Sequence, residues 1–346
     1  MTLSGDVLSL ATGLFDVSSA ASASVHSARA AIGERAATPG DAVRRAASEA
    51  GRAAVILLPD EVAPALAAIT EVAAAHAPLV VHVPFVAGDD TSAVAPLCET
   101  GAAVLSTWSP QEAAGVAVAL HRAAHDSEMP FVHLYDAPEG GGVAAPMDRA
   151  SIDAVLGALH PRSPAGLSAD RARVRSFGAR VPFALAAALR SAGERAGVSL
   201  PLLERFETTD ADEVVVTYGR TFGVACGVAK SMRASGRKVG VLGVRALRPF
   251  LAADVVKAIA RTKSAVVVEP LDPSLDPTGP LAACVKGAFF DALTWAPGFP
   301  GVGRVPAIVS VTSAHPVLRA SDVETALAEL SNGERARRVL VLGSEV

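Results

Sequence analysis

The histidines are the side chains in this sequence best suited to acid–base or metal chemistry. His121 and His125 are one helical turn apart, so they lie on the same face of the helix predicted around them. Two imidazoles at that spacing can bind a metal ion, but Asp126 is the only acid nearby and no third ligand is indicated. His133 alternates with apolar residues, which favours a core histidine bonded to the backbone. We therefore predict a surface or half-buried histidine pair and a structural His133.

Two glycine-containing segments follow predicted strands. The run Gly219-Arg220-Thr221-Phe222-Gly223 lies between a strand and a helix, where backbone amides can hold an anion. Gly140 to Gly142 follow Asp136 at a strand end, where α/β proteins often bind ligands, but they lack phosphate-loop spacing and favour a flexible loop. The sequence has no Gly-x-Gly-x-x-Gly fingerprint, so nicotinamide or flavin binding has no support.

Composition excludes several classes of protein. The balance of 31 basic against 35 acidic residues gives no basic field for nucleic acid or an anionic membrane. Cys98, Cys226 and Cys284 are too far apart in the sequence to suggest a zinc or iron–sulfur site. No apolar run reaches the length of about 20 residues that a spanning helix needs, and the start lacks the pattern of a secretory signal. We therefore expect a soluble protein in the reducing cytoplasm.

The elements that position these residues alternate between short β-branched runs and longer Ala-rich helices. This alternation predicts the α/β class, with two doubly wound, mostly parallel-sheet domains. In the first half, strands are predicted at 54–58, 79–83, 103–107 and 131–135, and helices at 60–76, 110–125 and 148–160. The run Ser109-Pro110-Gln111-Glu112 has the letters of a capping box at a helix start.

The second half repeats the alternation. Strands are predicted at 214–218, 239–244, 265–269, 307–311 and 339–342, with a helix at 224–235 between the first two. Pro270, Pro273, Pro277 and Pro280 predict an irregular loop after the third strand. The Ala-rich, basic stretch that follows residue 161 has no strand signal. We therefore predict domains at 1–161 and 206–346, joined by a helical linker at 162–205.

Three blocks of sequence carry a family resemblance. The run from Val239 to Phe250 resembles the second domain of the pyruvate:ferredoxin oxidoreductases, a transketolase C-terminal-like domain. The stretch 90–136, with its Thr-Gly pair, its Ser-x-Gln-Glu helix start and its Pro-Phe-x-His-x-x-Asp strand, is similar to the family's first domain, which binds the thiamine pyrimidine. The stretch 320–330 looks like the helix that closes the second domain. The resemblance implies a thiamine-diphosphate-binding fold followed by a transketolase C-terminal-like domain.

The chemistry that the resemblance implies is incomplete in this sequence. The family's catalytic glutamate stands in a Ser-Glu-Ala-Gly context, and Glu49 has these neighbours but lies too close to the next strand, whereas the family spacing falls near Glu34. Where relatives carry a substrate-binding arginine, two residues before the Thr-Gly pair, this chain has Cys98, which cannot pair with a carboxylate through two hydrogen bonds. The family's Thr-rich strand becomes Val55-Ile-Leu-Leu-Pro-Asp60, which lacks hydroxyls.

The same two-domain module resembles the N-terminal region of the fungal-type sulfite reductase flavoprotein subunit, in which an arginine replaces the glutamate, and Arg35 matches that arginine. We predict no catalytic, cofactor-binding or metal-ligating residue, and no cofactor unless a partner completes a site for thiamine diphosphate and magnesium. The predicted function is a non-catalytic scaffold or subunit-interaction module of an oligomeric oxidoreductase assembly, bound to other subunits or domains. Two alternatives stay open: an active α-type subunit of a 2-oxoacid:ferredoxin oxidoreductase, and a small-molecule binding protein that uses the turn at Gly219.

Overall fold

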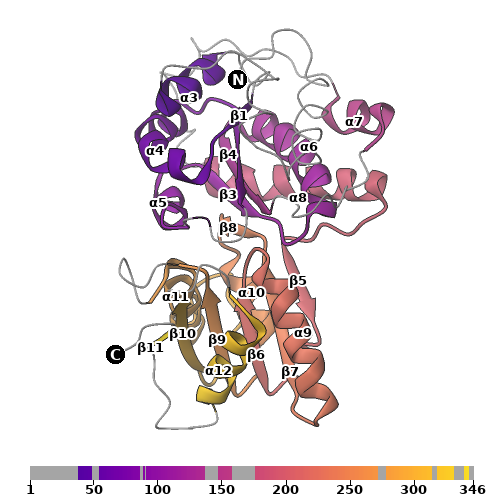
Figure 1. The fold of residues 1–346 in the computed structure, drawn as a ribbon, viewed down its shortest axis with the longest axis vertical. Helices are drawn as coiled ribbons and strands as arrows, with labels where there is room; N and C mark the ends of the chain where they lie inside the picture. The colour runs from indigo at the N-terminus through magenta and orange to yellow at the C-terminus, as the bar shows by residue number, and fades with distance from the viewer. Residues whose placement is uncertain are drawn as a thin grey trace. The chain divides into compact units, whose positions relative to one another are not determined.

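The computed structural model describes residues 38–48, 54–85, 89, 91–136, 147–157, 176–271, 278–313, 318–330 and 339–342. The chain forms two compact units, shown in Figure 1. Unit 1 consists of Met1–Val86 and Pro96–Leu202, and unit 2 consists of Ala87–Ala95 and Leu203–Val346.

The sheet of unit 1 is parallel and buried. Its strands are β1 (Ala54–Ile56), β2 (Leu79–Phe85), β3 (Ala103–Ser106) and β4 (Pro130–Asp136). They lie side by side in the order β1-β2-β4-β3. Their near-continuous apolar runs are typical of parallel strands, since helices cover both faces of such sheets.

Helices flank this sheet, with α4 on one side and α6 on the other in Figure 1. The helices of this part of the chain are α3 (Pro39–Ser48), α4 (Pro59–Ala74), α5 (Val94–Glu99), α6 (Pro110–Ser127), α7 (Arg149–Leu156) and α8 (Ser176–Ala196). Helix α8 lies within the stretch predicted as a linker. Its Val181, Leu185 and Leu189 are buried in one core cluster with residues of α6, so α8 is part of unit 1.

The start of α6 differs from its prediction. Ser109 is the N-cap residue and Pro110 begins the helix, but the Ser109 hydroxyl caps no backbone amide. It donates instead to the Glu112 carboxylate, with 3.2 Å between the oxygens. The predicted capping box is therefore wrong, because the serine and glutamate side chains bond to each other. Half of such a box occurs at α4, where the Leu58 amide donates to Glu61 at 2.9 Å.

The sheet of unit 2 is parallel except at one edge. Its strands are β5 (Leu203–Phe206), β6 (Glu213–Thr217), β7 (Val239–Val244), β9 (Ser264–Glu269), β10 (Ala307–Ser313) and β11 (Val339–Leu342). They lie in the order β11-β10-β9-β6-β7-β5, and the unpredicted β5 runs antiparallel to β7. A short strand, β8 (Ala246–Arg248), follows β7 in the sequence. The structure confirms the predicted α/β class with two mostly parallel sheets.

The helices of unit 2 include two that the sequence reading missed. They are α9 (Thr221–Ala234), α10 (Ala252–Ile259), α11 (Pro280–Leu293) and α12 (Ala320–Leu330), of which α10 and α11 were not predicted. Pro280, assigned to an irregular loop, is the first residue of α11, where the missing proline N–H costs nothing. None of the helices in the described ranges combines the length and apolar character of a membrane span.

Candidate functional site

The carboxyl edge of the unit 1 sheet is the place where a parallel α/β sheet presents a ligand site. After β1 the chain continues with Leu57 and Leu58, and the Leu57 side chain is fully buried. The Leu57 amide donates to the His82 carbonyl at 3.0 Å, so the backbone here is held in the sheet. The two residues that follow β1 therefore have apolar side chains, without a hydroxyl or a charge.

The Thr-Gly pair singled out in the sequence closes a turn. The Thr100 hydroxyl donates to the Leu97 carbonyl at 2.7 Å and accepts from the Ala102 amide at 3.3 Å. Gly101 has a φ of +89°, a conformation that favours glycine. Cys98, in the position where relatives carry arginine, is half-buried on α5. The pair thus has a structural role, and the neighbouring side chain has no positive charge.

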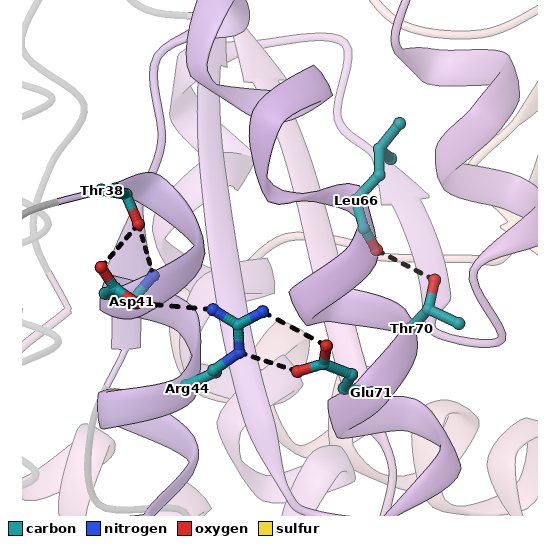
Figure 2. A network of polar contacts seen from close by, with 6 residues as sticks. All are labelled: Thr38, Asp41, Arg44, Leu66, Thr70 and Glu71. Atoms are coloured by element: carbon teal, nitrogen blue, oxygen red, sulfur yellow. Dashed lines mark hydrogen bonds and ion pairs between the residues drawn. The ribbon is translucent and has the colours of Figure 1, made fainter.

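A polar network holds α3 against α4, as Figure 2 shows. The Arg44 guanidinium donates two hydrogen bonds to the Glu71 carboxylate, at 2.7 and 3.2 Å, and these bonds lower the pKa of Glu71. Thr38 accepts from the Asp41 amide at 3.1 Å and caps the start of α3. Both charged partners are about half exposed, so the pair orients the helices more than it stabilises them.

Three histidines meet between the sheet and α6. His82 on β2 and His133 on β4 are register partners, and their Nδ1 atoms are 3.2 Å apart. The other ring nitrogen of His82, Nε2, lies 3.4 Å from Nε2 of His121 on α6. The Tyr135 ring stacks on His133 with centroids 5.1 Å apart. We call His82, His121, His133 and Tyr135 the histidine cluster.

Burial keeps His82, His121 and Tyr135 uncharged at neutral pH. It lowers the pKa of His121 to about 4. Burial, followed by charge repulsion from His133 and His121, lowers the pKa of His82 well below its usual value. Burial also raises the pKa of the Tyr135 phenol. Neutral imidazoles, each with one donor and one acceptor nitrogen, can form a hydrogen-bonded chain.

The geometry of the histidine cluster does not suit a metal ion. His82 directs one ring nitrogen at His133 and the other at His121, so the three rings do not converge on one point. Within the described ranges no group of three or more His, Cys, Asp or Glu side chains has the arrangement of a metal site. The three imidazoles instead form a linear chain that packs between the sheet and α6 and can form hydrogen bonds.

The predicted surface or half-buried histidine pair is wrong, because α6 packs in the core of unit 1 and both His121 and His125 are buried. His121 is buried in the histidine cluster, whereas Nδ1 of His125 lies 3.6 Å from Asp126. His133 is a core histidine as predicted, and its Nδ1 contacts the ring of His82. The sequence reading did not single out His82. The position of His82 could have indicated the contact, because His82 is the fourth residue of β2 and His133 is the fourth residue of β4.

The turn at Gly219 bonds largely to itself. The Phe222 amide donates to the Gly219 carbonyl and the Gly223 amide donates to the Arg220 carbonyl, both at 3.1 Å. These two amides are therefore not available to an anion. The Phe222 ring packs on β7, where a Cβ on Gly243 would come within 2.7 Å of it. The close approach explains a glycine in the middle of a strand.

A buried carboxylate, missed in the sequence, organises the start of α11. Glu269 ends β9 with no exposed surface, and it accepts hydrogen bonds from the Leu281 and Ala282 amides, both at 2.9 Å. Gly279 has a φ of +75°, and a Cβ there would overlap the Glu269 carboxylate. A negative charge at a helix N-terminus is favoured by the helix dipole. Glu269 is thus a helix cap joined to the sheet.

A surface hollow of about 610 Å³ lies along the C-terminal half of α8 and the residues after it. Its charged lining residues are Arg190 and Glu194, both exposed. None of the residues predicted for chemistry lines it. Glu34, Arg35, Glu49 and Gly140 to Gly142 lie outside the described residues.

Comparison with known proteins agrees with the resemblance seen in the sequence. Residues 211–296 match the family model described as pyruvate:ferredoxin oxidoreductase core domain II. This part of the chain is therefore similar to the pyruvate:ferredoxin oxidoreductases. Within this family, the pyruvate-flavodoxin oxidoreductase of Klebsiella pneumoniae is 25% identical over 56% of this chain and 18% of that protein. Pyruvate synthase subunit PorA of Methanosarcina barkeri is 35% identical over 20% of this chain and 17% of that subunit.

The chain thus spans less than a fifth of the length of these two relatives. Two solved structures share its fold. The 2-oxoglutarate:ferredoxin oxidoreductase from Magnetococcus marinus, with 2-oxoglutarate, coenzyme A and succinyl-CoA bound, has a TM-score of 0.61 at 13% identity, over 93% of this chain and 64% of that chain. A split gene transketolase, an inactive β4 tetramer, has a TM-score of 0.58 at 13% identity, over 95% of this chain and 98% of that chain.

Proposed function

We propose that the chain is a non-catalytic scaffold or subunit-interaction module of an oxidoreductase assembly related to pyruvate:ferredoxin oxidoreductase, working in the cytoplasm. One observation carries the proposal: the strand end that would face a pyrimidine ring carries the buried Leu57, with Cys98 in place of an arginine. An apolar edge cannot hydrogen-bond an aminopyrimidine or pair with a substrate carboxylate. His82 and His121 nearby are neutral at pH 7, and their Nε2 atoms lie within hydrogen-bonding distance of each other. The fold is kept while the polar groups of a thiamine site are replaced.

The isolated chain is therefore expected not to bind thiamine diphosphate and magnesium. Isothermal titration calorimetry of the full chain should give no binding heat up to millimolar cofactor. Its melting temperature should stay unchanged, whereas cofactor at 100 times its Kd would stabilise the fold by about 2.7 kcal/mol. A known thiamine-diphosphate enzyme in the same buffer is the positive control. Micromolar binding would contradict the proposal.

The partner defines which redox assembly the chain serves. A pull-down from the source organism, with mass spectrometry and cofactor analysis of the complex, identifies it. Under our proposal, the complex contains a sirohaem or flavin protein, or another redox assembly without thiamine; the match of Arg35 to the sulfite reductase flavoprotein branch supports the first of these. Recovery of an iron–sulfur subunit with thiamine diphosphate would favour the alternative below.

The alternative is an α-type subunit of a 2-oxoacid:ferredoxin oxidoreductase whose site is completed by a second chain. It is supported by the fold match to nearly the whole of the split gene transketolase chain, which is described as inactive as a β4 tetramer. The alternative requires a catalytic glutamate at Glu34 or Glu49.

Separate Glu34→Gln and Glu49→Gln variants distinguish the two functions. In the reconstituted complex, our proposal predicts unchanged turnover for both variants. The alternative predicts a loss of about 10²- to 10⁴-fold for one of them, as expected for a general acid–base group. Glu324→Gln, on the exposed face of α12, is the matched control.

A further inference from the structure

The outer face of α11 is unusually apolar for a helix face in contact with water. Its inner face packs on unit 2 through buried residues: Leu281, Ala282, Val285, Ala288, Phe289 and Ala292. Its exposed residues are Ala283, Cys284, Gly287, Phe290, Asp291 and Leu293. Within this fully described helix, Asp291 is thus the one exposed charge. A helix face with so few charges is normally covered.

Two aromatic side chains dominate this face. The Phe290 side chain is 64% exposed and the Trp295 side chain, just after the helix, is 76% exposed. Trp295 has a left-handed backbone, with a φ of 59°, and its ring lies so close to Gly301 that a Cβ there would overlap it. The indole is therefore fixed at the surface before any partner arrives. Exposed aromatic rings of this kind are the usual anchors of protein interfaces.

Small residues occupy the first half of this face, and large ones follow in the second half. Ala283 and Gly287 are one helical turn apart, and a Cβ at Gly287 would meet no atom within 4 Å. Phe290 projects one turn further on. We call Ala283, Gly287, Phe290, Leu293 and Trp295 the α11 patch. The Phe290 side chain projects from the helix, and the small residues Ala283 and Gly287 leave a shallow hollow on the same helix. A contact between two identical surfaces requires both features on one surface.

An antiparallel pair of α11 helices related by a twofold axis at Gly287 fits knob to hole. In this arrangement, the residue three positions after Gly287 in one copy faces the residue three positions before Gly287 in the other. Phe290 of one copy therefore contacts Cys284 and the nearby Ala283 of the second. The centre of the α11 patch is uncharged, so two chains of net charge −4 can meet there without burying like charges. At these exposures, Phe290 and Trp295 together offer roughly 250–300 Å², about a third of the ~800 Å² per partner of a standard interface.

We propose that the α11 patch binds the α11 patch of a second copy of this chain, as an antiparallel twofold pair. This inference goes beyond the proposed function and does not depend on it, because self-association needs neither a cofactor nor another subunit. A chain that dimerises and binds thiamine diphosphate would contradict the proposed function alone. A monomeric chain without thiamine binding would contradict this inference alone.

Sedimentation velocity of the full chain over a range of concentrations tests the pairing. Wild type should form dimers, and Phe290→Glu should raise the dimer dissociation constant at least about 30-fold, as for an interface anchor. Phe183→Glu is the matched control, because Phe183 is 77% exposed on α8, outside the α11 patch. Circular dichroism checks that both variants fold. The proposal would be overturned by a wild-type chain that stays monomeric at about 100 times the protein concentration of a usual assay. It would also be overturned by a Phe290→Glu variant that dimerises with an unchanged dissociation constant.

Cross-linking tests the geometry without weakening the contact. Gly287→Cys, in a Cys284→Ser background, places a thiol at the axis, and mild oxidation with oxidised glutathione should join two copies through a disulfide. Gly227→Cys in the same background is the control, because Gly227 is also an exposed helical glycine with no atom within 4 Å of an added Cβ. A covalent dimer from Gly287→Cys but not from Gly227→Cys supports the pairing. Equal yields from both, or none from either, contradict it.

Discussion

Replacing Glu269 with alanine is expected to lower the free energy of unfolding of unit 2 by about 3 kcal/mol. The carboxylate is fully buried and accepts the Leu281 and Ala282 amides, so its loss leaves two donors at the start of α11 without partners. Each unsatisfied buried group costs about 1–3 kcal/mol, and the favourable charge at the helix N-terminus is also lost.

Urea unfolding followed by tryptophan fluorescence measures this change. Trp108 lies in unit 1 and Trp295 in unit 2, so a Trp108→Phe background isolates the signal of unit 2. Glu269→Gln should fall between wild type and alanine, because its amide nitrogen cannot accept a hydrogen bond. Glu324→Ala, an exposed glutamate on α12, is the control. A Glu269→Ala midpoint equal to that of the control would show that the cap contributes nothing.

Acidification from pH 7 to pH 4 is expected to destabilise unit 1 through the histidine cluster. The folded-state pKa of His121 is about 4, below the usual value of 6.5, so the unfolded chain binds more protons between these two values. Stability from this group is complete above pH 6.5 and is lost as the pH falls towards 4. A shift of that size corresponds to roughly 3 kcal/mol. The lowered pKa of His82 acts in the same direction.

Urea unfolding at pH 7, 5 and 4, followed through Trp108 in a Trp295→Phe background, measures this loss. Carboxylates also titrate in this range, so the difference between variants is the informative quantity. His121→Leu should flatten the dependence of unfolding free energy on pH. His76→Asn, at a half-buried histidine outside the histidine cluster with a φ of 52°, is the control variant, because asparagine tolerates that backbone. Identical pH profiles for wild type and His121→Leu would mean that the pKa of His121 is the same in the folded and the unfolded chain.

The sequence by itself determined the class of fold and most strands. The predicted strands at 239–244 and 339–342 have the observed bounds of β7 and β11. Strand β9 begins one residue before its prediction, and β6 is displaced by one residue at both ends. Such runs are readable because a parallel strand covered on both faces must be apolar at nearly every position. The start of α6 at Pro110 was likewise visible, since proline is favoured at the first helical position.

The contacts between these residues, in contrast, follow from the tertiary structure and could not be predicted from local patterns. His82 and His133 are 51 positions apart and touch because β2 and β4 pair in one register, and a shift by a single residue would turn one ring to the other face. The sequence did not indicate the role of Glu269, because its partners are backbone amides of α11. That helix was not predicted, since it follows a proline-rich segment. Local patterns record whether a residue is buried, but strand register and long-range packing determine what it is buried against. For this protein, strand register and long-range packing therefore determine the chemistry of the polar residues.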